Sequence, residues 1–371
     1  MTTAGIYVHI PFCEHICNYC DYFTTEKREA EIPRFVEMLI REIKLTATDF
    51  DRNWQFDSIY LGGGSPALLP PRELEIILNK LKEYFPLSQI PEITLEINPG
   101  ENSIGDLQSF IEMGINRLSI GFQSLNPKFL NLLTRTHNQG DCVTIYEDAR
   151  RAGFDNISID MLYNIPGQAV TQWLNDLKTV VEMQPEHIAI YSLTAEVDTP
   201  FYTDIQNGIF SMLDAAIEGK MFRQGTSYLK DCRFTQYEVS HFAKPGMESV
   251  HNLHYWKRDP NLAFGPSAHS FDGKSRWWNV SSLDKYIEQL SQHKRPIEGT
   301  ENLSENQVHN EIVMNGLRTN IGIPSSCIDN SNGTPFHKWD AFLEKKNGAI
   351  FLKSDYFHLA DEIAMDLMIR E

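Results

Sequence analysis

The chain has 371 residues, 33 of them basic and 50 acidic, and a formal net charge of −17 at pH 7. Its 42% of hydrophobic and 22% of charged residues exclude an intrinsically disordered protein. The acidic balance argues against broad electrostatic binding to nucleic acid or to anionic membranes, because both require clustered lysine and arginine.

Six short segments in the first two hundred residues are rich in Ile, Val, Leu and Tyr. Such runs are typical of strands that are buried on both faces of a parallel sheet. The predicted strands are Ile6–Ile10, Ser58–Leu61, Ile93–Ile97, Arg117–Gly121, Asn156–Met161 and His187–Leu193. Helical spacing predicts helices over 31–46, over 71–85, from Pro127 with Asn126 as its N-cap, and over about 170–182. The alternation predicts a parallel α/β architecture, either a barrel or an open sheet.

The alternation stops near Pro200. Beyond it we expect helical segments over about 208–230, an aromatic-rich stretch from Tyr237 to Trp278 and a charged linker around His293–Asn302. The last part is expected to hold a helix near 305–319, a second helix near 336–345 and a hairpin over Ala349–Ala360. We therefore predict a barrel domain at 1–205, an extension at 206–298 and a small C-terminal domain at 299–371.

No apolar stretch approaches the ~20 residues of a membrane-spanning helix. The N-terminus also lacks the basic start and cleavage pattern of a secretion signal. We expect a cytoplasmic protein without a transmembrane segment, for which a peripheral membrane contact and a homodimer both stay open.

Polar residues recur at or near the carboxyl ends of the predicted strands. A cysteine-rich segment follows the first strand and a glycine triplet follows the second. Later strands carry Glu96, Asn98, Gln123, Asp160, Tyr191 and Thr194 at or near their ends. Because binding and catalytic groups converge at this end of parallel α/β folds, we expect one composite site there.

Three of the six cysteines, Cys13, Cys17 and Cys20, lie within eight residues in a C-x3-C-x2-C pattern. Three thiolates on a tight loop can hold three corners of a metal centre. Zinc would need a fourth ligand, for which His9 and His15 are the local candidates. A cubane iron–sulfur cluster normally takes four cysteines, so three would leave one iron open to a small molecule. The separate Cys142, Cys232 and Cys327 are expected to be small buried hydrophobic residues.

The motif Cys13-Glu-His-Ile-Cys17-Asn-Tyr-Cys20 resembles that of the radical S-adenosylmethionine (SAM) superfamily. In that family three cysteines bind a [4Fe–4S] cluster, and SAM chelates the fourth iron. More narrowly, the chain resembles the oxygen-independent coproporphyrinogen oxidase group, and within it the branch of heme chaperones. The matching segments begin at Tyr7, Gly62, Glu96, Arg117, Ser158 and Ile165. The resemblance implies a partial (β/α)6 barrel followed by a C-terminal helical or winged-helix-like region.

The resemblance assigns SAM contacts to Tyr7, Tyr19, Gly63, Gly64, Ser65, Glu96, Gln123, Arg135 and Asp160. Taken alone, these residues have simpler explanations as well. Gly62–Gly64 allow close approach to a ligand, whose carboxylate their N–H groups can bind, but they also suit a tight turn. Glu96 and Asp160 can accept hydrogen bonds from an amine and from ribose hydroxyls, or can cap and form ion pairs. Arg135 alone would be a solvated cation at a helix end.

The sequence departs from the family pattern at three positions. The oxidases carry a fourth cysteine two residues after the third, and Tyr22 occupies that position here. Ser65 replaces the usual Thr of the glycine motif and keeps a hydroxyl. Asn164 replaces a common Gly and tolerates a left-handed backbone. We expect only the first departure to change function.

A second motif, His251-Asn-Leu-His254-Tyr-Trp256, resembles the H-N-x-x-Y-W signature of the heme-chaperone branch. An imidazole beside an aromatic surface can ligate heme iron while the ring stacks on the porphyrin. His251 is the candidate ligand and His254 its local competitor. A hydrogen-bonded histidine in an aromatic core is the alternative that chemistry alone favours. His269 stays open as a structural residue or second ligand.

The resemblance implies a heme chaperone that holds a [4Fe–4S] cluster and SAM, takes heme from a donor and delivers it to an apo-hemoprotein. The alternative is a radical enzyme that oxidatively decarboxylates coproporphyrinogen III to protoporphyrinogen IX. Because Tyr22 stands where the oxidases have their fourth cysteine, we do not expect coproporphyrinogen dehydrogenase activity. A radical enzyme acting on RNA shares the cysteine motif, but the −17 charge argues against it.

Overall fold

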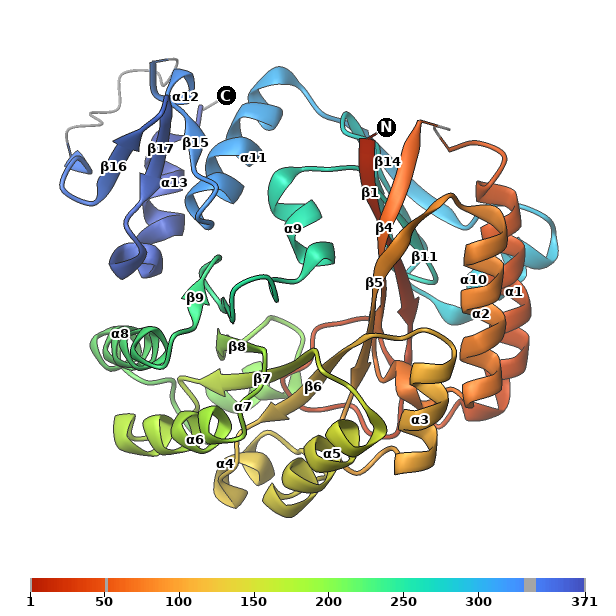
Figure 1. The fold of residues 1–371 in the computed structure, drawn as a ribbon, viewed down its shortest axis with the longest axis horizontal. Coiled ribbons are helices and arrows are strands. Elements are labelled where there is room, and N and C mark those ends of the chain that lie inside the picture. Colours follow the sequence, from red (N-terminus) through yellow and green to blue (C-terminus); the bar gives the residue numbers. More distant parts are fainter. Residues whose placement is uncertain (1, 51–52, 330–337, 370–371) are drawn as a thin grey trace.

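The computed structural model describes residues 2–50, 53–329 and 338–369. A curved parallel sheet forms its centre, with strands in the order β1-β4-β5-β6-β7-β8 (Figure 1). These strands are β1 (Thr2–Ile10), β4 (Trp54–Gly63), β5 (Leu87–Ile97), β6 (Arg117–Gln123), β7 (Ile157–Tyr163) and β8 (His187–Ser192). They confirm the predicted strands, with ends that differ by one to several residues. The partial barrel fold is therefore confirmed.

Helices cover the convex side of this sheet (Figure 1). They are α1 (Ile32–Thr46), α2 (Pro71–Tyr84), α3 (Ile104–Glu112), α4 (Pro127–Leu132), α5 (Gln139–Ala152) and α6 (Val170–Glu182). Asn126 caps α4 as predicted, because its side chain accepts a 3.0 Å hydrogen bond from the backbone N–H of Lys128. The apolar face of α2, formed by Leu74, Ile77, Leu78 and Leu81, is buried in full, and it packs this helix onto the strands.

The central sheet continues on both sides into a single sheet of 12 strands. Beyond β1 follow β11 (Asn261–Phe264), β12 (His269–Phe271), β13 (Ser275–Asn279) and β14 (Ile297–Asn302), and beyond β8 follow β10 (His241–Ala243) and β9 (Thr235–Gln236). The charged linker predicted at His293–Asn302 is therefore wrong for most of its length, since β14 is an edge strand paired with β13. Its side chains alternate between half-buried and exposed, so no apolar run reveals it. β14 also spans the boundary that was predicted between residues 298 and 299. The division into three domains stays a prediction.

A buried carboxylate attaches this extension to the barrel. Glu42 on α1 is 3% exposed and accepts hydrogen bonds from Gly265 N (2.9 Å), Asn279 Nδ2 (2.6 Å) and Tyr286 Oη (2.6 Å). Asn279 ends β13, and Tyr286 lies on α10 (Leu283–Ser291). Burial raises the pKa of Glu42 to about 7, although the three donors oppose the shift. All three partners donate hydrogen bonds to Glu42, so a side chain that accepts hydrogen bonds is required at residue 42.

The region after β8 begins with two helices, α7 (Pro200–Gln206) and α8 (Ala215–Asp231). The helical segments expected over about 208–230 are confirmed from residue 215 on, whereas α7 lies before that range. Gly208 has a φ of 71°, which ends the first helix. Helix α9 (Val250–Lys257) carries the H-N-x-x-Y-W motif and lies on the concave side of the sheet (Figure 1).

The C-terminal region contains helices and a small sheet, as predicted in outline. Its elements are α11 (Glu305–Leu317), β15 (Ile323–Pro324), α12 (Ser326–Asp329), β16 (Leu343–Lys346), β17 (Ala349–Leu352) and α13 (Ala360–Leu367). The helix predicted near 336–345 is wrong over its described part, because β16 begins there; residues 336 and 337 lie outside the described ranges. The hairpin is β16–β17, earlier than predicted, since Asn347 and Gly348 adopt positive φ at the turn.

No helix in the described ranges is both long and apolar enough to cross a bilayer.

Candidate functional site

A cavity of about 400 Å³ opens at the carboxyl ends of the parallel strands, and we call it the carboxyl-end pocket. Among its lining residues are Cys13, Cys17, Cys20, Tyr19, Gly63, Gly64, Ser65, Glu96, Gln123, Arg135 and Asp160. Asn98, Tyr191 and Thr194 line it as well. Of the residues that the resemblance assigns to SAM, Tyr7 is outside the lining. Its ring stacks on that of Tyr60, a lining residue, with centroids 6.1 Å apart. The structure therefore confirms that the polar residues at the strand ends lie around one cavity.

The cysteine loop runs between two short paired strands, β2 (Phe12–Cys13) and β3 (Thr25–Glu26). A second anchor is Asn18, whose N–H donates to Thr134 Oγ1 (2.9 Å) and whose Nδ2 donates to the carbonyl of Leu132 (3.0 Å). The loop is thereby held against the end of α4, more than a hundred residues away in sequence. The three cysteines are half-buried and form no disulfide.

The thiols of this loop suit a cluster better than zinc. In the described ranges no three cysteine, histidine or acidic side chains are grouped to hold a single metal ion. His9, one predicted fourth zinc ligand, is buried and uses Nε2 on the carbonyl of Phe23 (2.7 Å) and Nδ1 on Tyr7 Oη (3.2 Å). A [4Fe–4S] cluster binds each thiolate through a separate iron and so needs no such close group.

Positive charge lies beside the thiols. Arg135 Nη1 is 3.5 Å from Cys17 Sγ, and Nη2 donates to Asn98 Oδ1 (2.5 Å) and to the carbonyl of Gly121 (3.1 Å). Burial raises the pKa of Cys13 to about 12, and Arg135 opposes that shift. The guanidinium is thus placed to stabilise thiolates, as a metal centre on this loop would require. The alternative that Arg135 is a solvated helix-end cation does not match its contacts.

Two half-buried carboxylates face the cavity. Glu96 accepts hydrogen bonds from Tyr60 Oη (2.8 Å) and from the N–H of Gly63 (3.1 Å). Asp160 accepts from the hydroxyls of Ser119 (2.9 Å) and Ser158 (3.2 Å). Burial raises the pKa of Glu96 to about 7, with a further contribution from Asp160, and burial also raises the pKa of Asp160. A cationic ligand would relieve this unfavourable pairing, so the pocket suits a molecule with ammonium or sulfonium charge.

The glycine triplet has a different role from the one predicted. The N–H of Gly63 donates to Glu96, and that of Gly64 donates to the carbonyl of Ile10 (2.9 Å), so neither is free for a ligand carboxylate. A Cβ on Gly64 would lie 2.6 Å from the carbonyl oxygen of Phe12 and 2.9 Å from Cys13 Sγ. The glycines therefore let β4 approach the cysteine loop closely.

Among the lining residues that the sequence did not predict are Tyr60, Glu101 and Ser119. Ser65 Oγ donates to Glu101, which also accepts from Asn98 Nδ2 (3.0 Å). Tyr60 and Ser119 lie inside strands rather than at their ends. Ser119 falls within the matching segment that begins at Arg117, but the resemblance assigned it no role. The period of two along β4 is the one available signal, since it places Tyr60 on the same face as Gly62.

The structure also shows where two of the departures from the family pattern, Tyr22 and Asn164, lie. Tyr22, which occupies the position of the oxidases' fourth cysteine, lines the pocket and is 68% exposed. Asn164 has a φ of 65°, so the predicted left-handed backbone is confirmed. Gln123 likewise has a φ of 66°, which bends the end of β6 beneath the cavity.

His251 lies apart from the carboxyl-end pocket, inside the barrel. It is 1% exposed, and its Nδ1 and Nε2 share hydrogen bonds with Ser58 Oγ (3.0 Å) and Tyr255 Oη (2.9 Å). Its ring lies 5.2 Å from that of Tyr60, whose hydroxyl binds Glu96. Burial lowers the pKa of His251 to about 3, so the ring is neutral. The geometry matches the hydrogen-bonded alternative, and heme ligation by His251 would require this network to open.

His254 is held by two aspartates. Its Nε2 donates to Asp57 Oδ1 (2.6 Å) and its Nδ1 to Asp259 Oδ2 (2.9 Å). Burial works to lower the pKa of His254, but the hydrogen bonds to Asp259 and Asp57 outweigh it and raise the pKa to about 9. With a proton on both nitrogens, His254 has no lone pair to offer a metal.

Known proteins share both sequence and fold with this chain. Residues 7–180 match the Radical SAM superfamily. The chain is 34% identical to "Heme chaperone HemW" of Bacillus subtilis over 85% of this chain and 84% of that protein. It is 31% identical to the protein of that name from Lactococcus lactis, over 90% and 86% of the two chains. It is 32% identical to the bovine "Radical S-adenosyl methionine domain-containing protein 1, mitochondrial", over 86% and 74%.

A solved structure extends the likeness to the whole fold. Coproporphyrinogen III oxidase (HemN) from Escherichia coli matches with a TM-score of 0.83 at 20% identity, over 99% of this chain and 90% of that one. The barrel, its cysteine loop and the sequence match define a protein of the radical SAM superfamily. That superfamily implies a [4Fe–4S] cluster and SAM. Within it, the chain belongs to the HemW family.

Proposed function

We propose that the protein is a heme chaperone: it binds heme, takes it from a donor and transfers it to apo-hemoproteins. The observation that carries the proposal is the 34% identity, over 85% of the chain, to a protein named heme chaperone HemW. The H-N-x-x-Y-W motif on α9 supports it. The proposal places this work in the cytoplasm.

In this proposal the carboxyl-end pocket holds the cluster and SAM. Cys13, Cys17 and Cys20 would bind the cluster, whose open iron supplies a site for SAM and an electron for its cleavage. Arg135 stabilises the thiolates, while Glu96 and Asp160 supply the negative charge that pairs with a cationic ligand. All of the assigned SAM residues except Tyr7 line one cavity of about 400 Å³, which supports the proposal.

Tyr22 separates this function from that of the oxidases. A fourth thiol at this position belongs to the oxidase pattern, and a phenol cannot replace its chemistry. The likeness to HemN at 20% identity establishes the fold alone. We therefore favour a chaperone over oxidative decarboxylation.

Heme titration of the cluster-reconstituted protein tests the proposal. We expect a Soret band to develop, and we expect that band to move to apomyoglobin when the loaded protein is mixed with it. Absence of heme binding, or heme that is bound but never passed on, would reject the chaperone function. In a second assay, anaerobic incubation with coproporphyrinogen III, SAM and a reductant should yield no protoporphyrinogen. Its formation at a catalytic rate would establish the oxidase instead.

A further inference from the structure

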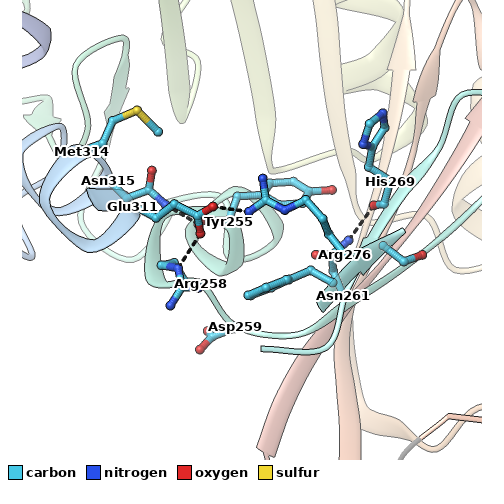
Figure 2. A pocket seen from close by; sticks show the side chains of 11 residues that line it. Tyr255, Arg258, Asp259, Asn261, His269, Arg276, Glu311, Met314 and Asn315 are labelled. Atoms are coloured by element: carbon cyan, nitrogen blue, oxygen red, sulfur yellow. Dashed lines mark hydrogen bonds and ion pairs between the residues drawn. The ribbon is translucent and has the colours of Figure 1, made fainter. Parts of the chain in front are cut away.

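A second pocket, of about 280 Å³, lies where the H-N-x-x-Y-W helix meets the sheet extension and the C-terminal region, and we call it the α9–α11 pocket. Its walls come from α9 and the turn after it, from β11–β13 and from α11 (Figure 2). Tyr255 belongs to this lining and also binds His251. Nothing in the carboxyl-end pocket lines it, so the two cavities are separate.

This pocket contains a histidine whose ring nitrogens make no hydrogen bond within the described residues. His269 on β12 is exposed, and its ring stacks on Trp278 with centroids 5.8 Å apart and planes 19° from parallel. The stacking orients the imidazole without occupying its nitrogens. A ring nitrogen of His269 is therefore available to a ligand that enters the pocket.

The same pocket contains two guanidiniums. Arg258 and Arg276 both bind the carboxylate of Glu311, Arg258 through Nε at 2.8 Å, and both lie over the ring of Phe271 (Figure 2). Arg258 Nη2 is buried and has no hydrogen-bond partner. An unsatisfied buried donor is unfavourable, so the site is suited to an additional anionic group. Glu311 pairs with both cations, and Glu301 lies 3.9 Å from Arg276 Nε, so the buried Nη2 of Arg258 is the donor that a ligand carboxylate would satisfy.

Apolar surface completes the lining. Tyr255 is 40% exposed and Met314 on α11 is 39% exposed, so both offer apolar area that a flat ligand would cover. In Figure 2 Met314 and His269 lie on opposite sides of the arginine–glutamate group. A neutral imidazole, aromatic and thioether surface, and guanidiniums are together the groups that recognise an iron porphyrin with carboxylate side chains.

We infer that heme binds in the α9–α11 pocket, with His269 as an iron ligand and with Arg258 and Arg276 recognising its propionates. The inference rests on the proposed heme-chaperone function and deepens it. Ligand pockets commonly measure roughly 300–1,000 Å³, so a cavity of about 280 Å³ covers only part of the macrocycle. Partial cover suits a protein that must release its heme to an acceptor.

The assignment separates the roles of the histidines. His251 is 1% exposed and shares both ring nitrogens with other side chains. It supports the pocket by binding Tyr255 rather than by meeting iron. His254 pairs both of its nitrogens with aspartates and holds the same helix in place.

Hemin titration of the cluster-reconstituted protein, followed by the Soret band, tests the inference on three variants. His269→Ala should weaken heme binding by about tenfold or more and shift the band. His269→Cys should bind heme with the altered spectrum of a thiolate ligand, which a merely structural histidine would not produce. His293→Asn is the matched control: His293 is exposed with a φ of 59°, a conformation that asparagine tolerates, and its spectrum should equal the wild type's.

The propionate contacts are tested with Arg276→Gln and hemin dimethyl ester. The variant should weaken binding about fivefold and the ester should weaken it more, because the ester removes both propionate charges. The ester should weaken binding to the variant by less than it weakens binding to wild type, since only Arg258 is left to recognise a propionate. Circular dichroism checks that each variant is folded. If wild type binds heme and His269→Ala and His269→Cys both keep its affinity and spectrum, the inference is overturned while the chaperone function stands. If wild type itself binds no heme, the proposed function fails first.

Discussion

The two pockets of this molecule are built in different ways. The carboxyl-end pocket collects residues that follow successive parallel strands, each within a short motif such as the cysteine trio or Gly62–Ser65. The α9–α11 pocket joins one helix, an antiparallel sheet extension and a C-terminal helix that have no common motif. The first therefore follows from local sequence and one topological rule. The second depends on how distant segments dock.

The pockets also differ in charge. Glu96 and Asp160 make the first suited to a cation, whereas Arg258 Nη2 is an unsatisfied cationic donor in the second. A chain of side-chain contacts connects them: Tyr255 binds His251, His251 lies against Tyr60, and Tyr60 binds Glu96. The difference suggests a division of labour, with SAM at one site and heme at the other.

The largest expected effect is confined to the first pocket. Cys17→Ser should abolish the cluster, because the remaining cysteines hold only two of its irons. Iron and sulfide content after reconstitution, together with the cluster's visible absorbance, measures this. Cys232→Ser is the control, since Cys232 lies half-buried at the end of α8 and should keep full iron content. Equal iron in both variants would contradict the cluster assignment.

The second-largest expected effect concerns His251, in the chain of contacts between the pockets. His251→Ala leaves Ser58 and Tyr255 without a partner and opens a cavity, so the free energy of unfolding should fall by about 2–4 kcal/mol. Chemical denaturation measures it. Heme bound at the α9–α11 pocket should keep its spectrum in this variant at temperatures where it stays folded. If a folded His251→Ala protein loses the heme spectrum of a histidine-ligated iron, His251 is the iron ligand. The assignment of that role to His269 would then be wrong.

Glu96→Gln should weaken SAM binding by about tenfold, because it removes a charge that faces the cationic ligand. In the wild type, burial and Asp160 place the pKa of Glu96 at about 7. SAM affinity should therefore rise from pH 6 to pH 7.5 as the carboxyl loses its proton, and the variant should lose this dependence. Isothermal titration at several pH values measures both. The exposed Glu75→Gln on α2 is the control. A variant with the wild-type pH profile would remove Glu96 from the site.

The smallest effect concerns the wall of the second pocket. Asp259 and Asp57 raise the pKa of His254 to about 9 against the opposing effect of burial, whereas the unfolded chain titrates near 6.5. The paired cation therefore stabilises the fold fully below about pH 6.5, and this contribution is lost as pH rises through about 9. Relative to His254→Gln, wild type should lose about 1 kcal/mol of unfolding free energy between these pH values. Parallel curves would show that the ion pairs contribute nothing.

Much of the barrel was predictable because its signals are local. Apolar runs marked the six parallel strands, and the strand-end rule brought Glu96, Asp160 and the cysteines together. The expectation that the glycine N–H groups bind a ligand carboxylate was wrong for Gly63 and Gly64, because their N–H groups donate to Glu96 and to the carbonyl of Ile10.

What escaped prediction depends on distant partners. β11 pairs with β1 in parallel although the two strands are about 250 residues apart in sequence, and no local sequence pattern predicts this pairing. Glu42 resembles an ordinary helix acid until Gly265, Asn279 and Tyr286 dock on it. Likewise, the burial of His251 depends on Ser58, which lies 193 residues earlier in the chain.

The separation of the two sites is tested most directly by hemin titration of the Cys17→Ser protein beside SAM binding to His269→Ala. The account predicts that the cluster-free variant binds heme with wild-type affinity and spectrum, and that His269→Ala keeps its iron and its SAM affinity. If heme binding is instead lost together with the cluster, the heme belongs to the carboxyl-end pocket and the division into two sites is wrong.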